Sequence, residues 1–333
     1  MKKKLFLVIM LLLLVVGCGK KEEKEEKKEE VVEPKNAIVI SDNKEHISLL
    51  DDNFDKVWGY KVKDIQNYYN ITRVDGNYIY YVDGDKLYRY DYVNEKNEDL
   101  EITMKDYWFF EVSGDDLIYN VLYDIYYVNL KDKKTSKLSI QSNNSIALID
   151  GLLFYTNKND GSLKMYNLST KENTMIDKKA RILEANKNSV LYVNEDNKYM
   201  IYNIEDKKST LAIQGWEYAL SSGDNYPIHL YNNKVYAIKE DTLAIYNEDK
   251  EEKVYTHKFN KDEEIHDFIM LNENKVLLIV NYLDPDIKCE SEYCDPVGEL
   301  KFILVDIKNK KEKEVKNNSE LFDEESDLQY IYN

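Results

Sequence analysis

Hydrophobic and polar residues alternate along most of the chain after residue 35, with a period of two residues. Stretches such as KLYRYDY (residues 86–92) and SLKMYNL (residues 162–168) would place apolar side chains on one face of a strand and polar side chains on the other. The spacing of three and four residues that an amphipathic helix requires does not dominate here. The pattern therefore predicts an all-β chain built from short strands.

The predicted strands belong to a repeating unit whose marker is a strand that ends in an aromatic or aliphatic residue followed by Asp or Asn. Each unit contains four strands, which we call a, b, c and d in chain order, joined by turns such as DGN (residues 75–77) and DGD (residues 83–85). The marker occurs at Leu50-Asp51, Tyr90-Asp91, Val128-Asn129, Tyr166-Asn167, Tyr202-Asn203, Tyr246-Asn247 and Val305-Asp306. A period near 40 residues with four antiparallel strands is typical of the blades of a β-propeller.

The two ends of the repeat region complement each other. The first unit contains candidates for strands b, c and d (AIVIS, HISLLD and KVWGY) but none for strand a, whereas the segment DLQYIYN (residues 327–333) is a single strand. Pairing the two would close the ring and cover both free sheet edges. We therefore predict a β-propeller of seven four-stranded antiparallel blades, closed by the C-terminal strand; a misread insertion would change the count to six or eight.

The first 18 residues predict the compartment. Lys2, Lys3 and Lys4 precede an apolar run of 12 residues, Leu5–Val16, which is shorter than the roughly 20 residues of a membrane-spanning helix and fits a signal sequence. The run ends in Val15-Val16-Gly17-Cys18, which resembles a bacterial lipobox and implies a diacylglycerol anchor on Cys18. We expect residues 1–17 to be a lipoprotein signal peptide; a plain secretory signal is the alternative.

Composition separates two further segments. Residues 20–33, KKEEKEEKKEEVVE, offer no apolar face for packing, so residues 18–35 are expected to form a charged, flexible stalk and residues 36–333 the propeller domain. The net charge of -17, from 46 basic and 63 acidic residues, argues against nucleic-acid binding. Together these segments predict a protein held on the extracytoplasmic side of the cell membrane.

Three units share a further motif on strand b. It comprises Tyr80-Tyr81-Val82-Asp83, Phe154-Tyr155-Thr156-Asn157 and Leu191-Tyr192-Val193-Asn194. These resemble the YWTD repeats of low-density-lipoprotein-receptor-like propellers, with Tyr where those repeats have Trp, and the repeats of similar bacterial lipoproteins. The resemblance implies a propeller that binds protein or other ligands, and it transfers no catalytic residue.

The sequence holds no recognisable catalytic motif. The patterns G-x-S-x-G, G-x-x-x-x-G-K, H-E-x-x-H and G-x-G-x-x-G do not occur, and His46, His229, His257 and His266 are not spaced as metal ligands. We therefore expect a binding protein rather than an enzyme. An extracytoplasmic hydrolase or lyase with an acidic site at the mouth of the channel is the alternative, because a catalytic carboxylate pair is defined by its separation in space.

Two long loops, residues 214–226 and 282–299, interrupt the repeat, and both fall on the face formed by the b–c and d–a connections. Cys289 and Cys294 in the second loop are expected to form a disulfide, since an extracytoplasmic location permits oxidation. Long loops on a rigid scaffold commonly bind ligands. The candidate binding residues are Trp216, Tyr218, Tyr226, Asp284, Asp286, Glu290, Glu292 and Tyr293.

The expected partner is an envelope protein, peptide or glycan, and the expected role is to bind or scaffold it. No cofactor or metal is predicted, although the acidic loop leaves calcium open; its spacing departs from an EF-hand and it lacks the central Gly. Two other interpretations stay open. The loop aromatics, Trp216 above all, could serve to pin the loops onto the disc, and the domain could be a purely structural accessory with a broad exposed apolar patch.

Overall fold

A computed structural model of the protein divides the chain into two compact units, Met1–Glu33 and Pro34–Asn333. The residues that the structure describes are 37–41, 46–51, 56–63, 72–216, 227–239, 241–247, 250–258, 263–283, 297–315 and 327–331, all in the second unit. They form strands and turns, and within these ranges there is no helix. Accordingly, no described helix has the length and apolar character to cross a bilayer.

The described strands of the second unit form six antiparallel sheets, and the first three are as follows. One contains β27 (Asp327–Ile331), β1 (Ala37–Ser41), β2 (His46–Leu50) and β3 (Lys56–Lys61). The next contains β4 (Thr72–Asp75), β5 (Tyr78–Asp83), β6 (Lys86–Asp91) and β7 (Lys96–Thr103). A seven-stranded sheet contains β8 (Phe109–Ser113), β9 (Asp116–Val121), β10 (Asp124–Asn129), β11 (Lys134–Ile149), β12 (Leu152–Asn157), β13 (Leu163–Asn167) and β14 (Asn173–Asp177).

The remaining three sheets have four strands each. They contain β15 (Ala180–Ala185), β16 (Ser189–Asn194), β17 (Tyr199–Asn203) and β18 (Lys208–Leu211); β19 (Ile228–Tyr231), β20 (Lys234–Lys239), β21 (Thr242–Asn247) and β22 (Lys250–Thr256); and β23 (Glu263–Asn272), β24 (Lys275–Leu283), β25 (Val297–Asp306) and β26 (Lys311–Val315). In each of these three sheets the strands are hydrogen-bonded in chain order.

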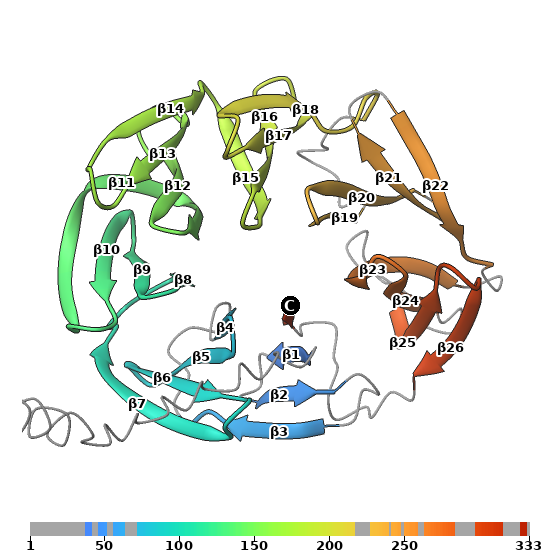
Figure 1. Cartoon of the computed structure of the whole chain (residues 1–333), viewed down its shortest axis with the longest axis horizontal. Helices are drawn as coiled ribbons and strands as arrows, with labels where there is room; N and C mark the ends of the chain where they lie inside the picture. Colours follow the sequence, from blue (N-terminus) through green and yellow to red (C-terminus); the bar gives the residue numbers. More distant parts are fainter. Residues whose placement is uncertain are drawn as a thin grey trace, which may run out of the picture. The chain divides into compact units, whose positions relative to one another are not determined.

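Within this unit the sheets follow one another in a propeller-like arrangement (Figure 1). Strands β8, β15, β19 and β23 lie toward the centre, and β7, β14, β22 and β26 lie toward the rim. Central strands of successive sheets contact one another, from β27 to β4, β4 to β8, β8 to β11, β11 to β15 and β15 to β19. The predicted all-β, propeller-like architecture is therefore confirmed.

The C-terminal strand pairs with the first strand of the domain. Strand β27 runs antiparallel to β1, with Ala37 opposite Ile331 and Ser41 opposite Asp327. This is the pairing that the incomplete first unit predicts. Because β1 pairs with β27 on one side and with β2 on the other, it does not present the edge that an unpaired terminal strand would expose, and β27 becomes the outermost strand of this sheet.

Strand β11 belongs to two four-stranded sets at once. Its first part pairs with β10, from Lys134 opposite Asn129 to Gln141 opposite Asp124. Its second part pairs with β12, from Ser142 opposite Asn157 to Ile149 opposite Leu152. One strand of 16 residues therefore runs from the rim of one set to the centre of the next.

The core lies between neighbouring sheets, and the strand period assigns residues to it. On β5, Ile79 and Tyr81 pack with Val39 and Ile47 of the preceding sheet, whereas Tyr80 packs with Phe110 of the following sheet. Because successive side chains point to opposite faces of a strand, β5, the second strand of its sheet, is buried on both faces. Burial of each such side chain stabilises the fold by about 1.5–3 kcal/mol.

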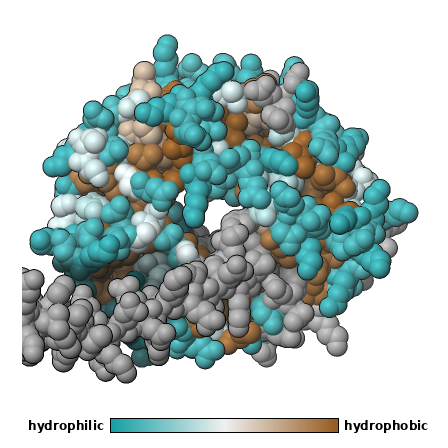
Figure 2. Space-filling view, viewed as in Figure 1, coloured by the Kyte–Doolittle hydropathy of each residue, from teal (hydrophilic) through white to brown (hydrophobic). Residues whose placement is uncertain are grey.

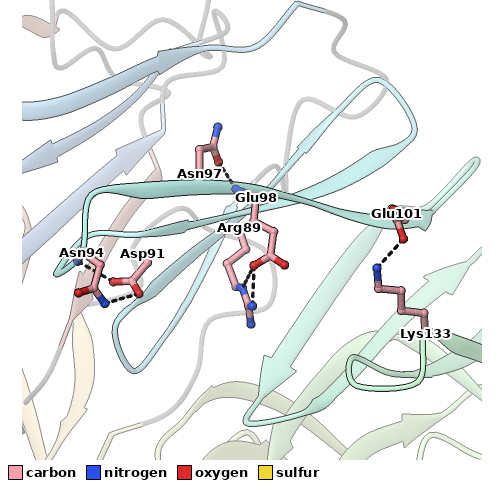
Figure 3. A network of polar contacts seen from close by, with 7 residues as sticks. All are labelled: Arg89, Asp91, Asn94, Asn97, Glu98, Glu101 and Lys133. Atoms are coloured by element: carbon pink, nitrogen blue, oxygen red, sulfur yellow. Dashed lines mark hydrogen bonds and ion pairs between the residues drawn. The ribbon is translucent and has the colours of Figure 1, made fainter. Parts of the chain in front are cut away.

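In five of the units the Asp or Asn of the repeat marker caps the turn that follows its strand. Asp91 Oδ1 accepts a hydrogen bond from the backbone N of Asn94 at 3.0 Å, as Figure 3 shows. The same bond recurs from Asp132 to Asn129 at 3.3 Å, from Thr170 to Asn167 at 2.9 Å, from Asp206 to Asn203 at 2.9 Å and from Asn309 to Asp306 at 2.9 Å. Short side-chain acceptors are suited to such turns, which explains why the marker repeats.

Candidate functional site

Most of the predicted site residues lie outside the described residues. This holds for Tyr218, Tyr226, Asp284, Asp286, Glu290, Glu292 and Tyr293, for the cysteines Cys289 and Cys294, and for Cys18. Trp216 is described, at the end of the segment that follows β18. It provides the starting point for the site.

Trp216 lines a cavity of about 680 Å³, a volume within the usual range of ligand sites. The turn between β16 and β17 supplies Asn194, Asp196 and Lys198, and the segment after β18 supplies Gln214 and the Trp216 ring. Met200, Leu211 and Ile213 contribute the apolar part of the lining. The cavity thus combines an apolar wall, an aromatic ring and a rim of amide and charged groups.

The polar rim is held by local hydrogen bonds. Asn194 Oδ1 accepts from the backbone N of Asp196 at 3.1 Å and from that of Lys198 at 3.0 Å, and the backbone N of Asn194 donates to Lys198 O at 3.1 Å. Asn197, at the tip, adopts a φ of 59°, which Asn tolerates better than most residues. The turn is therefore fixed before any ligand arrives.

Trp216 also has a structural role. Its ring meets Tyr246 edge-on at a centroid distance of 5.2 Å, and it packs against a cluster that includes Leu230 and Val235 of the next sheet. Lys239 Nζ lies 5.8 Å from the centre of the same ring. These contacts agree with the interpretation that Trp216 pins its loop to the disc, while the ring lines the cavity as well.

A second group of polar side chains lies on the central strands. His229 on β19 contacts Asp267 on β23 through Nε2, at 2.8 Å, and Glu184 on β15 through Nδ1, at 3.3 Å. Each carboxylate also accepts a backbone hydrogen bond at 2.8 Å, Glu184 from Leu230 N and Asp267 from Phe268 N. Three consecutive sheets are therefore joined by one ionic cluster.

The environment of His229 favours its charged form. Burial by itself would lower the pKa of His229, but the negative charges of Glu184 and Asp267 outweigh that effect and raise the pKa to about 10. The side chain is 31 % exposed and lies edge-on to Phe268 at 4.8 Å. At neutral pH the cluster therefore consists of an imidazolium between two carboxylates.

A second cross-sheet ion pair occupies equivalent positions. Arg73 Nε on β4 donates to Glu111 Oε1 on β8 at 3.0 Å. Arg73, Glu111, Glu184 and His229 each pair with the third residue of the strand that follows, namely Tyr80, Ile118, Leu191 and Tyr236. The sequence prediction missed the acids and Arg73; a charged residue in an otherwise apolar first strand is the signal that would have found them.

The other histidines are placed separately. His257 is buried and contacts Glu312 at 2.8 Å through Nδ1, and burial lowers its pKa. His266 Nδ1 lies 3.3 Å from Asn281 Nδ2, and His46 is exposed on β2. Among the described side chains, no group of three or more His, Cys, Asp or Glu residues is arranged to hold a metal ion.

The chemistry of the His229 cluster follows from its geometry. Its two carboxylates contact opposite ring nitrogens, so they do not converge on one point as metal ligands would. An imidazolium with a pKa of about 10 is a poor general base near neutral pH. The arrangement is suited to tying sheets together.

Comparisons with known proteins support the fold. No family model matches the sequence, and no curated protein matches it. Among solved structures, the chain is similar to Hsv2 of Kluyveromyces lactis, with a TM-score of 0.51 and 11% identity over 89% of this chain and 94% of that one. It is also similar to the dihydro-heme d1 dehydrogenase NirN, solved in complex with DHE, with a TM-score of 0.50 and 11% identity over 85% of this chain and 73% of that one. At this identity the likenesses show a propeller fold and nothing more.

Proposed function

We propose that this chain is a membrane-anchored bacterial lipoprotein whose seven-bladed propeller binds or scaffolds an extracytoplasmic protein, peptide or glycan. The blade count follows if β11 is shared, because the seven-stranded sheet then supplies two blades and the other sheets one each. Two of the units that resemble YWTD repeats use the second residue of the motif alike: Tyr81 and Tyr155 each accept a hydrogen bond of 2.6 Å, from Asn97 and Asn173.

The anchor rests on the N-terminal sequence. Removal of residues 1–17 would leave Cys18 with a diacylglycerol chain pair, and residues 18–35 would link it to the domain. Two acyl chains give durable membrane attachment, since each buried CH₂ contributes about 0.8 kcal/mol. Mass spectrometry of the N-terminal peptide from the purified native protein tests this: a diacylglyceryl mass on Cys18 is expected, and an unmodified Cys18 contradicts the anchor.

The Trp216 cavity is the observation that supports binding. Its apolar lining and aromatic wall would bury a side chain or sugar ring, while Asn194, Lys198 and Gln214 offer donors that fix orientation. The fixed turn lowers the entropic cost of binding. Because the first long loop begins at the lining residue Trp216, Tyr218 and Tyr226 are proposed to extend the cavity. The Cys289–Cys294 loop and its acidic residues are proposed to add to the binding surface, with calcium as their alternative occupant.

Substitutions at the cavity test this proposal. The native protein would be crosslinked in envelope preparations, and the partners captured by wild type, Trp216→Ala, Trp216→Phe and Lys198→Glu would be quantified. We expect Trp216→Ala and Lys198→Glu to reduce capture of the same partner about tenfold, which corresponds to about 1.4 kcal/mol, and Trp216→Phe to retain most of it.

Folding needs a separate control, because Trp216 also packs against Tyr246. Lys198→Glu changes only the rim and should leave the thermal midpoint unchanged, and Met175→Ala, an exposed apolar residue on β14, serves as the matched surface control. Capture by Lys198→Glu and Trp216→Ala at the wild-type level would refute the assignment of the site.

The alternative function is an extracytoplasmic hydrolase or lyase with its acids at the centre of the ring. The clustering of Glu184, His229 and Asp267 is the observation that favours it. Against it, both carboxylates are ion-paired with a protonated His, so neither is available as a free nucleophile or base. Binding is the better-supported proposal.

A further inference from the structure

A group of exposed apolar side chains, which we call the Trp108 patch, lies on the face of the b–c and d–a connections. Trp108 precedes β8, and Leu122 and Tyr123 form the turn between β9 and β10. Their exposed fractions are 49%, 58% and 41%. The backbone N of Trp108 donates to Asn120 O, and Asn120 Nδ2 donates to Leu122 O, so the three residues are neighbours.

The Leu122 backbone is unusual for this position. Leu122 adopts a φ of 55°, in the left-handed region that disfavours residues with a bulky side chain. The equivalent two-residue turn between β5 and β6 uses Gly84, with a φ of 65°, followed by Asp85. In this blade a strained, exposed Leu-Tyr pair thus replaces a relaxed, polar Gly-Asp pair. Strained residues of this kind often mark functional positions.

The patch is rigid and its surroundings are polar. The side chain of Asn120 is buried and accepts a hydrogen bond from Phe109 N at 3.0 Å, which fixes the segment of Trp108 against the Leu122 turn. Lys158 Nζ lies 3.4 Å from the centre of the Tyr123 ring. The charge of Asp124 is balanced by Lys137, at 2.6 Å. The patch therefore presents apolar side chains beside a lysine and a neutralised acid.

We propose that the Trp108 patch docks the domain onto the surface of a lipid bilayer. Trp and Tyr favour the boundary between headgroups and acyl chains, and a Lys beside them can keep its ammonium group in water. Leu122 and Tyr123 lie at the tip of a tight turn, so they could enter the headgroup region of a bilayer directly. A protein partner would need a pocket of matching shape to receive them.

The proposal rests on the proposed lipid anchor for its proximity to the membrane. The 18 residues from Cys18 to Lys35 could span at most about 60 Å, which keeps the domain at a high effective concentration over the bilayer. The net charge of -17 opposes approach to anionic lipids. Insertion of apolar side chains, rather than general attraction, must therefore hold the domain there.

Fluorescence quenching tests the docking. The full chain would be reconstituted with phosphatidylcholine vesicles brominated on the acyl chains, and the signal of Trp108 would be taken as the difference between wild type and Trp108→Phe. Trp58 and Trp216 pack against Tyr90 and Tyr246, so they provide a constant background. We expect most of the Trp108 signal to be quenched.

The variant Leu122→Gly separates docking from folding. Glycine accepts the left-handed backbone, so the thermal midpoint should not fall, whereas quenching of Trp108 should drop severalfold. Met175→Ala, 59% exposed in the wild type, should change neither. Equal quenching in wild type and Leu122→Gly, or no quenching of Trp108 at all, would overturn the proposal.

Two further readings distinguish the alternatives. Flotation of the chain with vesicles reports the anchor alone. Flotation without quenching of Trp108 refutes docking and leaves the anchor intact. Quenching of Trp108 in a chain whose Cys18 carries no lipid refutes the anchor and leaves docking intact. With vesicles that contain phosphatidylglycerol, raising the salt concentration should increase quenching, because salt screens the repulsion between the negatively charged domain and the anionic lipid. A decrease would contradict insertion and would show that lysines attract the domain to the lipid. Protection of Trp108 from acrylamide by a purified crosslinked partner, with no lipid quenching, would reassign the patch to a protein.

Discussion

Replacing His229 by Gln should reveal how much the charged cluster of the central strands contributes to stability. Gln is close in size to His and keeps a polar end, but it carries no charge. Glu184 and Asp267 would retain their backbone hydrogen bonds from Leu230 and Phe268. The variant therefore removes the ionic interaction without leaving a buried acid entirely unsatisfied.

The magnitude follows from proton linkage. His229 has a folded pKa of about 10, against 6.5 for an ordinary His. A group whose pKa is raised on folding gives its full stabilisation below the unfolded pKa and loses it as the pH rises through the folded value. At about 1.4 kcal/mol per pH unit the upper limit is about 5 kcal/mol. Because the side chain is 31 % exposed, solvent screening should reduce this to about 2–3 kcal/mol.

The assay is urea unfolding of wild type and His229→Gln at a series of pH values from 6 to 10. The wild type should be more stable by about 2–3 kcal/mol near pH 6, and the gap should close toward pH 10 as the imidazolium loses its proton. Met175→Ala, at an exposed position on β14, is the control that removes no titratable group, and it should show no such gap. A gap that stays constant, or widens with pH, would refute the charged state assigned to His229.

Three further predictions concern closure, turns and the cysteines. Deleting residues 327–331 should leave β1 without its partner and abolish the single cooperative urea transition; an unchanged midpoint would show that the pairing of β27 is dispensable. Asn167→Ala removes two turn hydrogen bonds of 2.9 Å and should lower the free energy of unfolding by about 1–2 kcal/mol in the same assay. Lys171→Ala is the exposed control in the same turn, where the φ is 62°, and it should lower the free energy of unfolding by less. Peptide mapping of the native protein without reductant should show Cys289 joined to Cys294; alkylation of both thiols would contradict the disulfide.

The strand pattern and the repeat marker were sufficient to predict the fold class and the pairing of the chain ends. The marker works because the Asp or Asn of five units makes a local hydrogen bond in its own turn, as Asn129 does with Lys131, so the signal is contained in a few adjacent residues. Strand β11 shows the opposite case. Its middle, QSNNS (residues 141–145), has the composition of a turn, yet the chain continues as one strand from Lys134 to Ile149. Ser142 N in this middle part donates to Tyr123 O in the turn between β9 and β10. This bond joins residues far apart in the sequence, so a local pattern cannot predict it.

The central ion pairs could be predicted only from the strand register, which sets the level of each residue along its strand. Arg73 and Glu111 are 38 residues apart in the sequence, and their contact depends on both residues occupying the same level of adjacent first strands. Alternation alone gives the face of a side chain but not its level. Asp267 adds a further step, because β23 contains a register shift between Ile265 and Asp267 that moves it within reach of His229.

The departures from the repeat, more than the repeat itself, point to function. Turns capped by Asp or Asn and second strands buried on both faces recur from blade to blade because they stabilise the fold. A Leu-Tyr pair in place of Gly84-Asp85, or a cavity beside Trp216, meets no such need, and the strained Leu122 backbone works against stability. A feature that costs stability in one blade, while its equivalent in another blade is relaxed, has to be retained for something outside the fold. By this reasoning the face of the b–c and d–a connections is where contacts with other molecules should be sought first.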